Sequence, residues 1–247
     1  MKKIILILLI TLPFFCKSQS NINDGTSKQY FENGIPTVNK DWSPEEYATA
    51  MNKIMELYDN KTIPLPSNNK GKEVFEKIAN YENYWFFQSE EFTNKDKMFF
   101  CLDIMKPISQ YYLKYYQSGT KNNGVLNNGT EILTIQKTLI KIMDKMLELT
   151  DDFVAKNPNL TEIQKEGLKK IKFGLNSFIS GTIMILNNEY TNYLENDICD
   201  LSNVFFNFYK KNRNTIDEVS KNEFDKECAN LNKNHKLDCI KKSALME

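Results

Sequence analysis

The sequence predicts an all-α protein, a multi-helix bundle of about seven or eight helices, several of them long, with no significant sheet. Three observations carry this prediction. Apolar side chains recur three and four residues apart over long stretches, as they do on one face of a helix. Helix-capping sequences open several of these stretches. The 247 residues include only nine glycines and seven prolines, which is too few turn residues for a many-stranded β fold.

The first 18 residues have the pattern of a cleavable export signal. Lys2 and Lys3 give it a positive start, and residues 4–15 form an apolar stretch that is too short to cross a bilayer. Small residues then precede a cleavage point before Gln19. We therefore expect an exported protein, periplasmic or extracellular, in which residues 1–18 are removed.

A lipoprotein signal is the less favoured alternative for the same segment. In that case Cys16 would be acylated and would anchor the chain to the outer membrane, but Phe15 stands where a small residue is usual. Cleavage removes three lysines from a chain with 32 basic and 32 acidic residues. The mature chain is therefore weakly acidic. Because it has no basic stretch, we expect no nucleic-acid binding. Because it has no long apolar segment, we expect no transmembrane helix in the mature chain.

Residues 19–42 lack helical periodicity, so we expect a surface leader that is partly disordered. A single α-helical domain is expected over 43–247. Ser43, Pro44 and Glu46 form a helix start, with an N-cap serine and a proline at the first helical position. A second helix is expected over 73–83.

The remaining helices follow in order along the chain. Thr93 with Asp96 and Thr161 with Gln164 have the spacing of capping boxes. The polar segment 117–130 predicts a loop between two helical halves. The spacing predicts helices over 93–116, 132–154 and 161–186, two more that begin near Asp197 and at Thr215 with Glu218, and a short one after Lys236.

The residue types exclude many catalytic constellations. The chain has one histidine, His235, and one arginine, Arg213. A serine or cysteine triad would have to use His235, which has no nucleophile motif near it, and paired-histidine zinc sites are excluded. No phosphate-binding or dinucleotide glycine pattern occurs. We therefore nominate no catalytic residue, no metal site and no cofactor.

Four cysteines remain after cleavage, an even number in an exported protein. Cys228 and Cys239 flank a polar turn between the last two helices, so a disulfide between them is the favoured pairing. Free buried thiols are the alternative, and a metal site that joins these two cysteines to His235 is weaker because the spacing matches no zinc motif. Cys101 and Cys199 pair only if their helices are neighbours.

Aromatic residues are concentrated between Tyr81 and Tyr116. They can form a contact surface or cleft, because adjacent aromatics on one helix cannot all face one core, or they can fill a core that several helices share. The core interpretation is favoured for the cluster as a whole. The candidate binding residues are Tyr84, Trp85, Phe86, Tyr111 and Tyr112.

The sequence therefore favours a non-catalytic binding or interaction protein. Its expected partner is a protein of the cell envelope or a small apolar ligand held between helices. The alternative is a hydrolase or lyase that uses carboxylates in a cleft between helices. A concave pocket with two or more carboxylates would favour the enzyme, and an exposed apolar patch would favour the binding protein.

Overall fold

The structure, a computed structural model, describes residues 31–32, 35–36, 87, 90 and 92–245. The predicted export signal over 1–18, the helices expected from residue 43 and over 73–83, and the candidate contacts Tyr84, Trp85 and Phe86 lie outside these residues. Within the predicted leader, the structure describes only β1 (Phe31–Glu32) and β2 (Ile35–Pro36), which pair as antiparallel strands.

The described part of the chain is an all-α bundle, as predicted. Both capping boxes expected from the sequence are present, one at Thr93 and Asp96 and the other at Thr161 and Gln164. The two helices that follow these boxes therefore begin where their local signals place them, whereas the helix expected over 132–154 begins three residues earlier, at Gly129, without a side-chain cap. The α-helices are α5 (Asn94–Ser118), α6 (Gly129–Lys156), α7 (Glu162–Met184), α8 (Glu195–Asn212), α9 (Glu218–Asn234) and α10 (Asp238–Ser243).

Three short helical segments connect the later helices. A π-helix, η2 (Ile185–Glu189), follows α7 directly, and a 3-10 turn, η3 (Tyr190–Asn192), leads on towards α8. A second 3-10 turn, η4 (Arg213–Thr215), joins α8 to α9. The cap of α9 is therefore Asp217 rather than Thr215, because the 3-10 turn uses Thr215 and the Asp217 side chain accepts from the Ser220 N–H.

The predicted loop over 117–130 contains a small β-hairpin. β3 (Lys121–Asn122) pairs antiparallel with β4 (Val125–Leu126). Between them Asn123 and Gly124 have φ angles of 51° and 84°. Positive φ at both central residues is the geometry of the tight hairpin turn that an Asn-Gly pair favours. The sequence contains that pair, so the hairpin was locally encoded.

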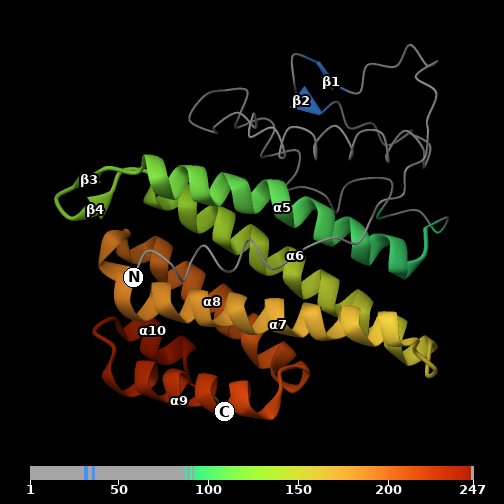
Figure 1. The fold of residues 1–247 in the computed structure, drawn as a ribbon. Coiled ribbons are helices and arrows are strands. Elements are labelled where there is room, and N and C mark those ends of the chain that lie inside the picture. The colour runs from blue at the N-terminus through green and yellow to red at the C-terminus, as the bar shows by residue number, and fades with distance from the viewer. Residues whose placement is uncertain (1–30, 33–34, 37–86, 88–89, 91, 246–247) are drawn as a thin grey trace.

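The described helices lie in layers that share one core. Figure 1 shows α5 and α6 crossing at one side, α7 and α8 in the middle, and α9 and α10 at the other side. The apolar stripe of α6 faces its neighbours along nearly its whole length. Among the largest side chains of the shared core, Tyr111, Phe205, Phe206 and Tyr209 are almost fully buried.

One buried polar contact fixes α6 against α7. The amide of Gln136 donates to the hydroxyl of Thr182 at 2.9 Å, and that hydroxyl donates to the carbonyl of Phe178 at 3.0 Å. Both polar side chains are nearly inaccessible to water. Because a buried donor without a partner is costly, this pair specifies how the two helices meet.

No helix among the described residues is long and apolar enough to cross a membrane.

Candidate functional site

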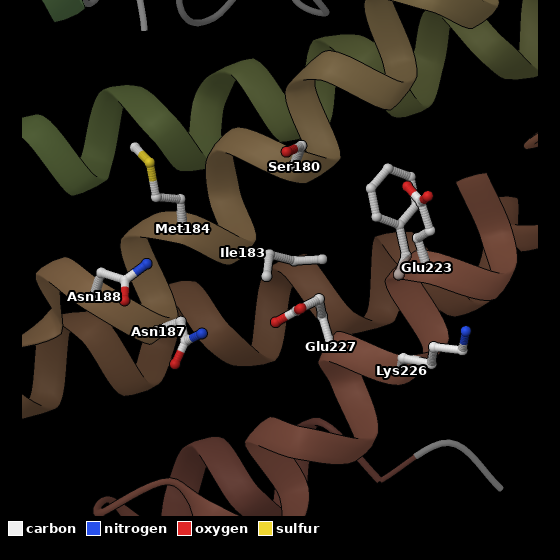
Figure 2. Close-up of a pocket in the computed structure, with 9 residues that line it drawn as sticks. Ser180, Ile183, Met184, Asn187, Asn188, Glu223, Lys226 and Glu227 are labelled. Carbon is white, nitrogen blue, oxygen red and sulfur yellow. The ribbon is translucent and has the colours of Figure 1, made fainter. Parts of the chain in front are cut away.

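A groove of about 480 Å³ lies between the end of α7 with η2 and the facing side of α9. Figure 2 shows its two walls and the side chains that line it. A volume of this size is in the range of small-molecule sites. The lining residues are Ser180, Ile183, Met184, Asn187, Asn188, Glu223, Phe224, Lys226 and Glu227.

The first wall comes from α7 and the π-helix that continues it. Ser180, Ile183, Met184 and Asn187 are three or four residues apart and so share one face of a helix. Asn188 follows Met184 by four residues and lines the groove beside Asn187. Both asparagines lie in the π-turn, which holds one more residue than an α-turn and rotates less per residue.

The second wall is α9, where two glutamates stand one turn apart. Glu223 and Glu227 are exposed, whereas Phe224 between them is only 8% exposed and forms part of the floor together with Ile183. The groove therefore has an apolar floor with carboxylates along one edge. In Figure 2 the Glu227 carboxylate points towards the side that carries Asn187, and the Lys226 amine points away from Ile183.

Hydrogen bonds at the start of α9 hold the two walls together. The Asn176 amide on α7 donates to Asp217 at 2.6 Å and to the Ser220 hydroxyl at 2.9 Å. Hydrogen bonds from the Ser220 N–H, the Ser220 hydroxyl and the Asn176 amide lower the pKa of Asp217 to about 2, because each favours the charged carboxylate. The N-cap of α9 is thus also the attachment point of α9 to α7.

A second attachment fixes α9 through its other side. Asp225 accepts from Nε of Arg213 at 2.9 Å and from a second guanidinium nitrogen, and it also accepts from the Tyr209 hydroxyl at 2.9 Å. The guanidinium lowers the pKa of Asp225 by hydrogen bonding to the charged form. The only arginine of the chain is therefore used to hold α9 and η4 on α8.

His235 supports the π-helix from the turn between α9 and α10. The Leu237 N–H donates to Nδ1 of His235 at 3.0 Å, which leaves the proton on Nε2. Nε2 then donates to the carbonyl of Leu186 at 3.0 Å. The ring also packs edge-on against Tyr190, with 4.4 Å between ring centroids. Both ring nitrogens are used in backbone hydrogen bonds, so His235 has no free nitrogen to act as a base.

The polar side chains of the groove lack the side-chain partners that polar residues elsewhere on α9 have. In the part of the chain that the structure describes, none of them makes a side-chain hydrogen bond or ion pair. Elsewhere on α9, Glu218 pairs with Lys221 and Asp225 pairs with Arg213. Unused donors and acceptors around an apolar floor are what a ligand site provides. The set comprises Ser180, Asn187, Asn188, Glu223, Lys226 and Glu227.

The sequence-predicted contacts on α5 lie elsewhere. Tyr111 and Tyr112 are 0% and 6% exposed and belong to the hydrophobic core, as the core interpretation of the aromatic cluster expected. Burial, and to a smaller extent the charge of Glu189, raises the pKa of Tyr112. Neither tyrosine lines the groove or offers an exposed contact surface.

The predicted disulfide between Cys228 and Cys239 is wrong. Cys239 is bonded to Cys199, with 5.6 Å between the Cα atoms, and this bridge joins α10 to α8. Cys228 is a buried free thiol on the face of α9 that also carries Phe224 and Leu231. Burial raises its pKa to about 12, so it is an inert thiol that packs as a small apolar group.

Sequence reasoning missed the groove, although one signal for it exists. Like charges four residues apart on a helix repel each other and cost a few tenths of a kcal/mol. Glu223 and Glu227 are such a pair. The one lysine at helical spacing from either of them is Lys226, three residues after Glu223, and it makes no ion pair with Glu223 in the described structure. A like-charge pair without an ion-paired lysine leaves two carboxylates that can accept a cation from outside the helix.

Within the described residues, no three histidine, cysteine, aspartate or glutamate side chains gather closely enough to hold a metal ion. Comparisons of this chain with protein-family models, with curated proteins and with solved structures found no match.

Proposed function

We propose that this chain is an exported, non-catalytic binding protein that holds its ligand in the groove between α7 with η2 and α9. The observation that supports this proposal is the set of six polar side chains around an apolar floor, none of which has a side-chain partner in the described structure. The mixed lining favours a ligand with polar groups over a purely apolar one.

The export part of the proposal rests on residues 1–18. An exported protein works away from cytosolic nucleotides and most metabolic chemistry, and holding a partner or a small molecule fits that location. The mass of the intact protein from its native host should correspond to a chain that begins at or near Gln19. A mass that includes an acylated Cys16 would replace cleavage with lipid anchoring.

A groove-blocking variant tests the binding function. Ser180 is exposed on the groove wall, so Ser180→Trp fills the groove without disturbing the core. Phe173→Trp is the matched control, because Phe173 is an exposed residue of the same helix that lies outside the groove. Both variants should keep the helical circular-dichroism spectrum of the wild type.

Ligand-observed NMR with a mixed library of small amines, carboxylates, sugars and aromatics gives the readout. At least one chemical class should bind the wild type and Phe173→Trp but not Ser180→Trp. If no class shows this dependence on Ser180, the groove is not a binding site and the proposed function is wrong.

The carboxylate enzyme remains the second candidate because Glu223 and Glu227 share one concave site. Both carboxylates are exposed, whereas a catalytic acid is usually kept partly buried. If the wild type turns over a compound class that it binds in the NMR experiment, and if Glu223→Gln and Glu227→Gln abolish this turnover, the enzyme is favoured over the binding protein.

A further inference from the structure

We infer that the groove recognises an ammonium group on an aliphatic stem, supplied by a free polyamine or by a lysine side chain of a partner. This inference rests on the proposed function and names the chemical class of the ligand. The argument comes from the charges of α9 and from the floor between its two glutamates.

The carboxylates of α9 divide into two sets. Glu218 and Asp225 are paired with Lys221 and Arg213 and lie outside the groove lining. Glu223 and Glu227 line the groove, and no lysine or arginine among the described residues pairs with either of them. Two like charges one helical turn apart are unfavourable unless a cation lies between them, and the groove is where such a cation can enter.

The floor and the opposite wall suit the rest of such a ligand. Phe224 and Ile183 are almost fully buried and give a narrow apolar surface. Methylene stems of amines pack on surfaces of this kind while the charged end reaches polar groups. Across the groove, the side-chain oxygens of Asn187 and Asn188 can accept further N–H donors, and an ammonium group has three.

Anionic ligands fit the same site poorly. The charged side chains of the lining are two glutamates and one lysine, and the Lys226 amine points away from the floor. An anion would be repelled by both carboxylates and would find one cation on the outer side. A neutral diol could use the asparagines but would leave both carboxylates without a counter-ion.

Isothermal titration with four probes tests the inference on the full-length protein. The probes are 1,5-diaminopentane, N-acetyl-lysine amide, 1,5-pentanediol and glutarate. One or both amines should bind, whereas the diol and glutarate should not. Tighter binding of the diamine would identify a free polyamine as the source, and tighter binding of the lysine amide would identify a partner side chain.

Two glutamine variants on α9, one double and one single, supply the matched comparison. In Glu223→Gln with Glu227→Gln, amine binding should weaken by at least about tenfold, the loss expected when hydrogen bonds to a charged group are removed. Glu218→Gln changes a carboxylate outside the groove and should bind the amines as the wild type does. The two groove glutamates are exposed and make no side-chain hydrogen bond or ion pair with other described residues, so the double variant should fold normally, which a thermal melt verifies.

The two proposals fail in different ways. If a library class binds in a Ser180-dependent manner but neither amine binds, or if the double glutamine variant binds the amines unchanged, the ammonium inference is wrong and the binding function stands. If neither the library nor the amines show binding that depends on Ser180, both are wrong.

Discussion

Asp217 shows how one residue can serve two purposes in this fold. Its side chain caps α9 through the Ser220 N–H and receives the Asn176 amide from α7. A capping aspartate could be expected from the sequence near this point, because Asp-Glu before a helix is a common start. The contact with Asn176 could not, since it depends on how two helices pack.

The first prediction is a pH dependence that disappears in Asp217→Asn. The pKa of Asp217 is lowered from 3.8 to about 2, so its carboxylate stabilises the folded state above about pH 4 and this contribution is lost as the pH falls towards 2. Asparagine also caps helices but does not titrate in this range.

Urea unfolding of the two proteins between pH 2 and 6 gives the measurement. The stability advantage of the wild type over Asp217→Asn should shrink as the pH falls through this interval. A constant difference would show that Asp217 is not held in its charged form by the fold.

Single residues also explain why the predicted disulfide was wrong. Chain spacing made Cys228 and Cys239 the simplest pair, but spacing does not tell which side of each helix faces the core. On α9 the core side carries Cys228, whereas the side of α10 that holds Cys239 faces α8. The direction of a side chain is decided by the packing of several helices, which one local sequence does not encode.

At the scale of elements, the disulfide between Cys199 and Cys239 attaches the shortest α-helix to the bundle. Six residues cannot form a stable helix alone. On the loop-entropy model, a bridge across 40 residues stabilises the fold by about 4 kcal/mol.

The second prediction is therefore that a reductant lowers the free energy of unfolding of the wild type by up to about 4 kcal/mol. The reductant should not change the free energy of unfolding of the double variant that carries Cys199→Ser and Cys239→Ser. Peptide mapping without reduction should recover the peptide around Cys199 joined to that around Cys239. Recovery of Cys228 in a disulfide would contradict this pairing.

The contact between α6 and α7 supports a third prediction. Thr182→Val removes the acceptor of the buried Gln136 amide and should cost about 1–3 kcal/mol of stability. In a Gln136→Met background the same substitution should cost much less, because no buried donor is then left without a partner.

A double-mutant cycle followed by chemical denaturation measures this coupling. Equal costs of Thr182→Val in the two backgrounds would mean that the hydrogen bond does not contribute to the packing of the helices. Local signals predicted both helices, since the apolar stripe of α6 and the capping box and apolar stripe of α7 each lie within one segment. They did not predict this pair, which joins two segments far apart in the sequence.

At the scale of the whole molecule, the buried apolar residues of α5 to α10 form one continuous cluster. No layer of the described bundle has a core of its own, although the loop over 117–130 divides the helices in the sequence. We therefore expect these helices to unfold together.

The fourth prediction is that amide hydrogen exchange gives similar opening free energies for the central turns of α6, α8 and α9. Exchange followed by mass spectrometry under native conditions resolves the three helices. A much lower value for α9 would show that the layer carrying Glu223 and Glu227 opens independently of the rest.

The whole molecule also explains why the groove was beyond sequence reasoning while the fold class was not. An all-α fold follows from periodicity and scarce turn residues, which are properties of each segment. The groove exists because Ser180 and Glu223, on two helices that α8 separates in the sequence, come to face each other. Composition pointed away from histidine chemistry, but it gave no information on where a ligand could lie.

The π-turn at Ile185–Glu189 gives the groove a dependence on chain length. Such a turn contains one residue more than an α-turn, and each residue of an α-helix rotates the chain by about 100°. Deleting Asn188 would leave every neighbouring side-chain type intact. It would nevertheless turn the following residues to other directions and move the Leu186 carbonyl relative to His235. A relative of this protein could therefore keep every other groove residue and still lose the groove through a one-residue gap, a change that a count of substitutions would not register.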